Sequence, residues 1–82
     1  MMVLQRDLEI YRMELDGKYE YQLFYLGKPI KSIISFHTYR YGAVNVSPVD
    51  GSICIYSMYT NTDTIPDSEI DDPTTFIVPV KL

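Results

Sequence analysis

The chain of 82 residues has no tryptophan, one cysteine and one histidine, and it contains no long apolar run. A single thiol, that of Cys54, excludes an internal disulfide, and chains without disulfides are typical of reducing compartments. No apolar stretch approaches the ~18 residues that a membrane-spanning helix needs. Arg6, Asp7 and Glu9 lie too early for the apolar core of a signal peptide. We therefore expect a cytoplasmic protein with no membrane partner.

Catalytic and cofactor motifs are also missing. The sequence has no Gly-rich phosphate loop, no Cys/His set at metal-binding spacing and no paired catalytic carboxylates on defined elements. Cys54 and His37 are the one conceivable nucleophile and base, but Cys54 lies in a predicted strand between two isoleucines. A thiol in that setting behaves as a small inert hydrophobe. We therefore expect no enzymatic activity, no cofactor and no metal.

The length predicts a single domain over residues 1–82, because a chain this short cannot form two cores. Val, Ile, Tyr, Phe and Thr dominate its apolar and near-apolar positions, which favours β-structure. The first two strands are predicted within residues 8–26, folded back on each other around Asp16-Gly17, a strong hairpin signal. Residues 18–25 alternate cleanly between apolar and polar, as a half-buried strand does.

Two registers are possible for this hairpin. A two-residue loop places Met13 opposite Glu20 and Tyr11 opposite Gln22, so that apolar residues face polar ones. A three-residue loop that includes Leu15 makes four matched pairs, each worth ~0.2–1 kcal/mol. These pairs are Glu14 with Lys18, Arg12 with Glu20, Met13 with Tyr19, and Tyr11 with Tyr21. We therefore predict the three-residue loop, which gathers the tyrosines on one face.

Four further strands are predicted, over residues 30–41, 43–47, 53–59 and 76–81. Pro79 places the last of them at a sheet edge or a bulge. Residues 61–75 have low hydrophobicity and room for one helical turn.

Six strands joined by tight turns predict an all-β fold, either a small antiparallel barrel or a two-layer β fold. The alternative is an N-terminal helix over residues 3–15, where Leu4, Leu8, Tyr11 and Leu15 recur at helical spacing. The fold would then be α+β, with that helix packed on an antiparallel sheet.

Charge is distributed unevenly along the chain. Residues 1–45 contain six basic and five acidic residues, whereas residues 46–82 contain one basic and six acidic residues. The net charge of −4 therefore comes from the second half, and such an asymmetry can steer a charged partner. The acids of the low-hydrophobicity segment are candidates for contacting a basic protein surface: Asp63, Asp67, Glu69, Asp71 and Asp72. Their spacing does not match a calcium-binding loop, and a solvated loop without a role is the simpler interpretation.

Tyrosine is the most unusual count, with eight residues. Tyr19, Tyr21, Tyr39 and Tyr41 cluster in the more basic half and are candidates for a binding face on the sheet. Aromatic rings beside basic side chains can stack single-stranded bases, and tyrosine also suits protein-binding surfaces. Tyrosine equally suits half-buried strand positions with no binding role. The negative net charge makes nucleic acid the less favoured partner.

These observations predict a small non-catalytic interaction module. Its sharper form is an acidic inhibitor or adaptor that occupies a basic, nucleic-acid-handling surface of a partner protein. Small phage and mobile-element proteins often work this way, and the analogy is one of size and charge. The first alternative is a single-stranded nucleic-acid binder that uses the tyrosines with Arg40. The second is a homo-oligomeric structural subunit, in which the edge expected at residues 76–81 pairs two copies.

Overall fold

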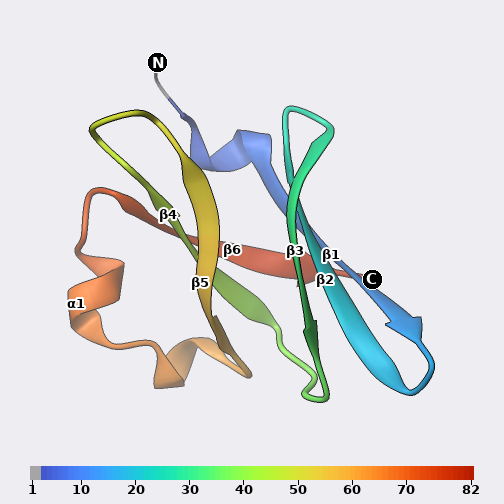
Figure 1. Ribbon diagram of the computed structural model, residues 1–82. Helices are drawn as coiled ribbons and strands as arrows, with labels where there is room; N and C mark the ends of the chain where they lie inside the picture. Colours follow the sequence, from blue (N-terminus) through green and yellow to red (C-terminus); the bar gives the residue numbers. More distant parts are fainter. Residues whose placement is uncertain (1–2) are drawn as a thin grey trace.

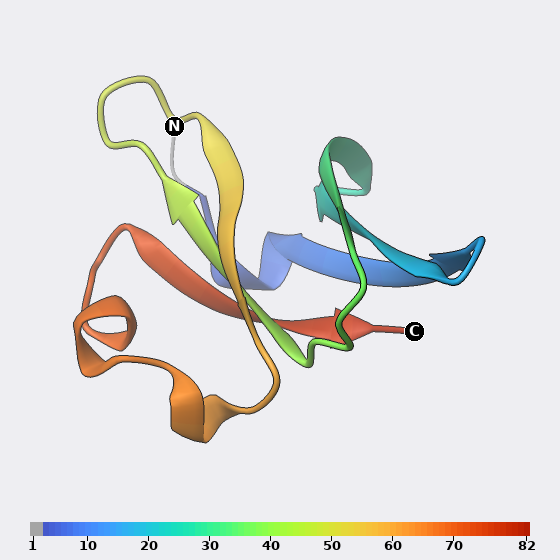
Figure 2. The same ribbon diagram turned by 60° about the horizontal axis from the view of Figure 1, so that its bottom comes forward.

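The computed structural model describes residues 3–82, which form one six-stranded mixed sheet that nearly closes into a barrel (Figures 1 and 2). Its strands are β1 (Leu8–Leu15), β2 (Lys18–Tyr25), β3 (Lys28–Ser35), β4 (Tyr41–Val46), β5 (Ile53–Tyr59) and β6 (Thr75–Lys81). Their order in the sheet is β3-β2-β1-β6-β4-β5, and neighbours are antiparallel except for the parallel pair β1–β6. Within residues 3–82, helical structure consists of the short turns η1 (Gln5–Asp7), η2 (Thr62–Thr64) and α1 (Asp67–Ile70).

The predicted all-β fold is confirmed, and the alternative of a helix over residues 3–15 is wrong. Only the single turn η1 is helical there, and β1 begins directly after it at Leu8. Leu8 and Ile10 point to the same side of β1 and are buried, which is the alternation of a strand with one face on the core. The helical spacing of the leucines is therefore coincidental.

The core lies between the β1–β2–β3 half of the sheet and the β4–β5–β6 half. Its buried side chains come from both halves: Leu8, Ile10, Tyr21, Leu23, Val44, Ile55 and Val78. Burial of each aliphatic side chain stabilises the fold by about 1.5–3 kcal/mol. Because the sheet curls, one continuous sheet supplies both walls of this core.

The predicted three-residue loop of the first hairpin is wrong. Leu15 pairs with Lys18, so the loop consists of Asp16 and Gly17 alone. Both loop residues have positive φ, at 53° and 76°, as a type I′ turn requires. The observed pairs place apolar residues opposite polar ones, Met13 with Glu20 and Tyr11 with Gln22. They are tolerated because this face of the hairpin lies outside the barrel, where apolar and polar residues can mix.

The one-residue difference in register moves every side chain of β1 to the other face. Tyr11 and Met13 therefore lie outside, and Ile10 faces Leu23 in the core. The expected grouping of Tyr11 and Met13 with Tyr19 and Tyr21 is not found.

The predicted edge at residues 76–81 is also wrong, because β6 lies inside the sheet between β1 and β4. Pro79, which has no N–H, is accommodated because the neighbouring Val80 donates to Arg40 O over 2.7 Å and pairs with Ile10 of β1. The strands at the ends of the sheet order are β3 and β5. Pro29 lies in β3, at a bulge opposite Phe24, which agrees with the preference of proline for edge strands.

The predicted strand over residues 30–41 is shorter than expected, since β3 ends at Ser35 and residues 36–40 form a loop. Gly42, which separates the predicted strands over residues 30–41 and 43–47, is instead buried within β4. A Cβ atom at this position would overlap Cδ1 of Ile10 and lie 3.1 Å from Sδ of Met58. Glycine is therefore needed here for close packing of β4 against β1.

We expect Gly42→Ala to destabilise the fold by about 1–3 kcal/mol, because the added methyl group overpacks the core. Ile10→Val removes the Cδ1 atom that the methyl group meets, and by itself costs about 0.5–1.5 kcal/mol. The double variant should lose less unfolding free energy than the sum of the losses in the two single variants, as measured by urea unfolding. Simple additivity would contradict the contact between these positions.

Candidate functional site

The first candidate site is the acidic segment, residues 61–72, which lies between β5 and β6 in the chain and includes η2 and α1 (Figure 1). Ile65 is buried at 6% exposure and anchors the middle of this segment to the body of the protein. Pro66 is the N-cap residue of α1 and has an extended backbone, φ −61° and ψ 142°, so the helical turn begins directly after it. The segment is therefore an ordered surface element.

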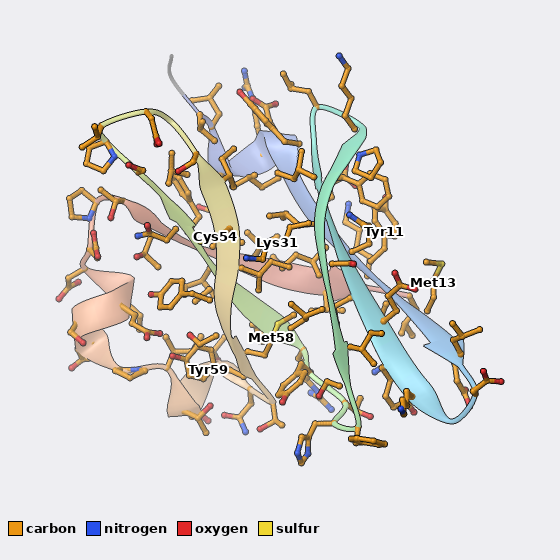
Figure 3. All side chains as sticks on the ribbon, viewed as in Figure 1. Tyr11, Met13, Lys31, Cys54, Met58 and Tyr59 are labelled. Carbon is orange, nitrogen blue, oxygen red and sulfur yellow. The ribbon has the colours of Figure 1, made fainter. Side chains whose placement is uncertain are left out.

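Two of its five acidic side chains have structural partners. The Tyr59 hydroxyl, at the end of β5, donates to Glu69 Oε2, and Figure 3 shows Tyr59 beside this segment. Oδ1 of Asp72 accepts from Thr74 N over 2.8 Å and from Thr74 Oγ1 over 2.7 Å. These contacts tie the segment to β5 and to the start of β6.

The other three acids, Asp63, Asp67 and Asp71, are exposed. Among the described residues the one ion pair is between Lys81 and Glu9, with 2.9 Å between Nζ and Oε2. Lys81 is the single basic residue of the second half of the chain, and its partner belongs to β1. The acidic segment is therefore not neutralised within residues 3–82.

The pKa values of two groups reflect these contacts. Hydrogen bonds from the side chain and backbone of Thr74 lower the pKa of Asp72, so its carboxylate stays ionised to lower pH. Burial raises the pKa of Tyr59, and the hydrogen bond to the Glu69 carboxylate raises it further. Both groups keep the protonation states that their hydrogen bonds need at neutral pH.

The four candidate tyrosines do not form an exposed platform. Tyr21 is fully buried, and its hydroxyl donates to His37 O over 2.5 Å and accepts from Tyr39 N over 2.9 Å. It therefore holds the loop after β3 in place and cannot contact a partner. The ring of Tyr19 is half-buried, and the Arg12 guanidinium lies 4.6 Å from its centroid. The predicted binding role of Tyr21 is therefore wrong, because Tyr21 is a core residue. The ring of Tyr19 is only partly available, because Arg12 covers one of its faces.

Tyr39 and Tyr41 are brought together at a second candidate site, which we call the arginine groove. Its cavity measures about 390 Å³, and two arginines and two tyrosines are among the residues that line it. Its lining residues are Arg12, Thr38, Tyr39, Arg40, Tyr41, Pro79, Val80 and Leu82. Neither arginine has an ion-pair partner among the described residues. The groove can therefore accept an anionic group beside aromatic rings.

His37 and Cys54 lie in different parts of the fold. His37 is exposed in the loop between β3 and β4, with its ring 5.8 Å from that of Tyr39. Cys54 is half-buried near the start of β5 (Figure 3). The structure does not pair them as a nucleophile and base. Within residues 3–82, no cluster of three or more His, Cys, Asp or Glu side chains could hold a metal ion.

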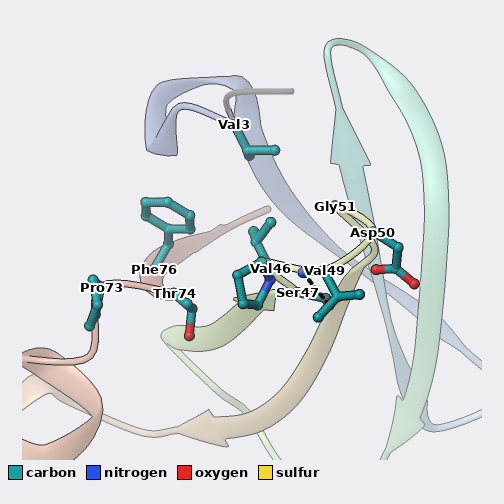
Figure 4. Close-up of a pocket in the computed structure, with 10 residues that line it drawn as sticks. Val3, Val46, Ser47, Val49, Asp50, Gly51, Pro73, Thr74 and Phe76 are labelled. Atoms are coloured by element: carbon teal, nitrogen blue, oxygen red, sulfur yellow. Dashed lines mark hydrogen bonds between the residues drawn. The ribbon is translucent and has the colours of Figure 1, made fainter.

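A further hollow of about 420 Å³ lies between the β4–β5 turn and the start of β6 (Figure 4). Val3, Val46, Val49 and Phe76 supply most of its apolar lining. Asp50 lies at its rim and accepts from Ser52 N over 2.9 Å, which lowers the pKa of Asp50. The other polar side chains of the lining are also engaged, since Ser47 Oγ accepts from Val49 N over 3.2 Å and Thr74 Oγ1 donates to Asp72 Oδ1 over 2.7 Å. The polar groups of the hollow therefore already serve the fold.

The sequence reasoning missed an apolar surface on the β1–β2–β3 ribbon. Met13, Leu15, Ile34 and Phe36 are exposed at 53, 59, 66 and 73%. With Lys18 and Glu20 they form what we call the outer face, at the end of the ribbon that carries the Asp16-Gly17 turn. Figure 3 shows Tyr11 and Met13 on this side of the sheet, away from Cys54 and Met58. The register of a two-residue hairpin loop, worked out from the sequence alone, places Met13, Leu15, Lys18 and Glu20 on one face.

Comparison of the chain with protein-family models, with curated proteins and with solved structures finds no match. In the part of the chain that the structure describes, no helix has the length and apolar character to cross a membrane. The function is therefore proposed from the geometry of these surfaces.

The hydrogen bonds of Asp72 predict a pH dependence. A carboxyl group whose pKa is lowered by folding contributes stability above its ordinary pKa of 3.8, and this contribution is lost as the pH falls through the lower folded value. Thr74→Val removes the hydroxyl donor, so the pKa of Asp72 should rise towards 3.8 in an NMR titration.

The difference in unfolding free energy between the wild type and Thr74→Val should accordingly shrink as the pH falls below the pKa of Asp72. Thr64→Val is the matched control, because the Thr64 hydroxyl donates to the backbone oxygen of Asn61 and touches no carboxylate. Its effect on stability should not change over the same pH range. An unchanged Asp72 pKa in Thr74→Val would refute the assigned hydrogen bond.

Proposed function

We propose that the protein is a small non-catalytic module that binds a partner protein, with the acidic segment docking on a basic surface. The observation that supports this most directly is an ordered segment whose five carboxylates have no basic partner within residues 3–82. Unneutralised charge on one side of a protein attracts an oppositely charged surface and accelerates association.

The order of the acidic segment favours binding. Ile65 fixes its middle, and the contacts of Glu69 and Asp72 fix the second half. Because these residues are already held in the free protein, little conformational entropy remains to be lost when a partner binds. Asp63, Asp67 and Asp71 remain exposed for contact.

The sharper form of the proposal is an inhibitor or adaptor for a nucleic-acid-handling protein. Carboxylates spaced along an ordered segment can occupy the lysines and arginines that otherwise contact phosphate groups. The structure modifies the expected set of contact residues, because Glu69 and Asp72 also support the fold. We therefore assign the direct contacts to Asp63, Asp67 and Asp71.

Neutralising Asp67→Asn and Asp71→Asn together should reduce capture of the partner from native cell extract by about tenfold at low salt. The matched control is Asp7→Asn with Glu14→Gln, which changes the net charge equally at two acidic residues outside the acidic segment, the arginine groove and the outer face.

The control should retain the partner, and the difference between the variants should disappear at high salt, where exposed charges are screened. Equal capture by both double variants at low salt would contradict a role for the acidic segment.

The arginine groove favours a second candidate function, binding of single-stranded nucleic acid. Arg12 and Arg40 lack ion-pair partners in residues 3–82, and Tyr39 and Tyr41 line the same cavity. Two guanidinium groups beside two phenol rings suit a phosphate with its base. The negative net charge opposes this candidate, so we place it second.

Titration of labelled single-stranded DNA and RNA oligonucleotides at low salt tests this candidate, because phosphate contacts are strongest there. If it holds, Arg12→Gln with Arg40→Gln should abolish the mobility shift. Arg6→Gln, in the η1 turn, should leave it nearly unchanged. Absence of any shift with the wild type would eliminate the candidate.

A further inference from the structure

The outer face has an ordered pattern of apolar and charged side chains. Leu15 of β1 and Phe36, the residue directly after β3, flank Lys18 of β2 in one row, and the Lys18 Nζ lies 5.2 Å from the centroid of the Phe36 ring. Met13 and Ile34 flank Glu20 in the next row. Each row therefore has a charge in the centre and an apolar side chain on either side, and the two charges are opposite.

This surface is exposed although its side chains are large and apolar. A hollow of about 210 Å³, lined by Leu15, Asp16, Lys18, Glu20 and Ile34, lies within it. Aromatic residues and methionine on an exposed apolar surface are typical of protein interfaces. The charged side chains of this surface are Lys18, Glu20 and, in the hollow, Asp16, which give a net charge of only −1, so the outer face does not select a strongly basic or strongly acidic partner.

We propose that the outer face binds the outer face of a second copy of this chain, which forms a symmetric dimer of stacked sheets. A two-fold axis that runs across the strands at the level of Tyr19 superimposes each row of one copy on the other row of its partner. Lys18 then faces Glu20 of the second copy. Leu15 faces Met13, and Phe36 faces Ile34, so every contact joins side chains of compatible chemistry.

The charges select this axis over the other possible one. A two-fold axis parallel to the strands would place Lys18 on Lys18 and Glu20 on Glu20, and like charges that meet in an interface oppose association. The axis across the strands also directs the remainder of each copy to opposite ends. Figures 1 and 2 place the acidic segment far from the free end of the β1–β2 hairpin, so the two acidic segments of the dimer remain apart.

The size of the contact indicates a reversible dimer. A ribbon of three eight-residue strands measures about 26 Å by about 14 Å, from ~3.3 Å per residue and ~4.8 Å per strand. The area that it can bury per copy is below the roughly 800 Å² of a standard stable interface. The inferred dimer should therefore dissociate on dilution and leave the acidic segment of each copy free.

Sedimentation equilibrium over a wide concentration range measures this association. The wild type should dimerise as its concentration rises, and Lys18→Glu or Glu20→Lys alone should raise the dissociation constant by about tenfold or more, since each places two like-charged pairs in the interface. The double variant Lys18→Glu with Glu20→Lys restores opposite charges across the axis and should return the dissociation constant towards the wild-type value. Circular dichroism melting curves show whether each variant is folded.

Two further variants separate the outer face from apolar exposure in general. Ile34→Glu should abolish the dimer, because it removes an apolar contact and adds a charge. Val49→Glu is the matched control, since Val49 is 92% exposed in the β4–β5 turn and outside the proposed contact. It should leave the dissociation constant unchanged. A wild type that remains monomeric at its highest soluble concentration, or a double charge exchange that fails to restore the dimer, would overturn the proposal.

Discussion

The Asp16-Gly17 turn determines which side of β1 enters the barrel, and much of the remaining architecture depends on it. With two residues in the turn, Ile10 meets Leu23 inside the sheet, and Met13 and Leu15 are left outside. The inward position of Ile10 in turn requires a glycine at position 42, because no Cβ atom fits between them. The turn, the core and the exposed apolar face are therefore consequences of one register.

The protein has three surfaces with different chemistry. Within residues 3–82, the acidic segment has carboxylates without a basic partner, the arginine groove has guanidinium groups without an ion-pair partner beside tyrosines, and the outer face has apolar side chains around Lys18 and Glu20. A partner protein on the first and a second copy on the last are compatible, because these surfaces lie at opposite ends of the molecule (Figure 1). The two proposed contacts therefore do not exclude each other.

The burial of Tyr21 illustrates how one residue can suggest a binding role from sequence and have a structural one in the fold. Its ring lies in the core and meets that of Tyr39 at 5.4 Å, and its hydroxyl satisfies two backbone groups of the β3–β4 loop. A buried tyrosine hydroxyl needs such partners, and here they order the loop that presents Tyr39 and Arg40 to the groove. The tyrosine thus shapes a candidate site without lining it.

The sequence by itself determined the all-β fold, most strand positions and the acidic character of residues 61–72, because alternation, turn residues and composition are local properties. Only the tertiary structure decided the register of the first hairpin, the central place of β6 and the burial of Tyr21. These depend on which distant strands meet: Pro79 suggested an edge, yet the parallel pairing with β1 begins one residue later. Side chains that look mismatched across a hairpin are acceptable when the rest of the chain leaves that face outside, and this information is not local.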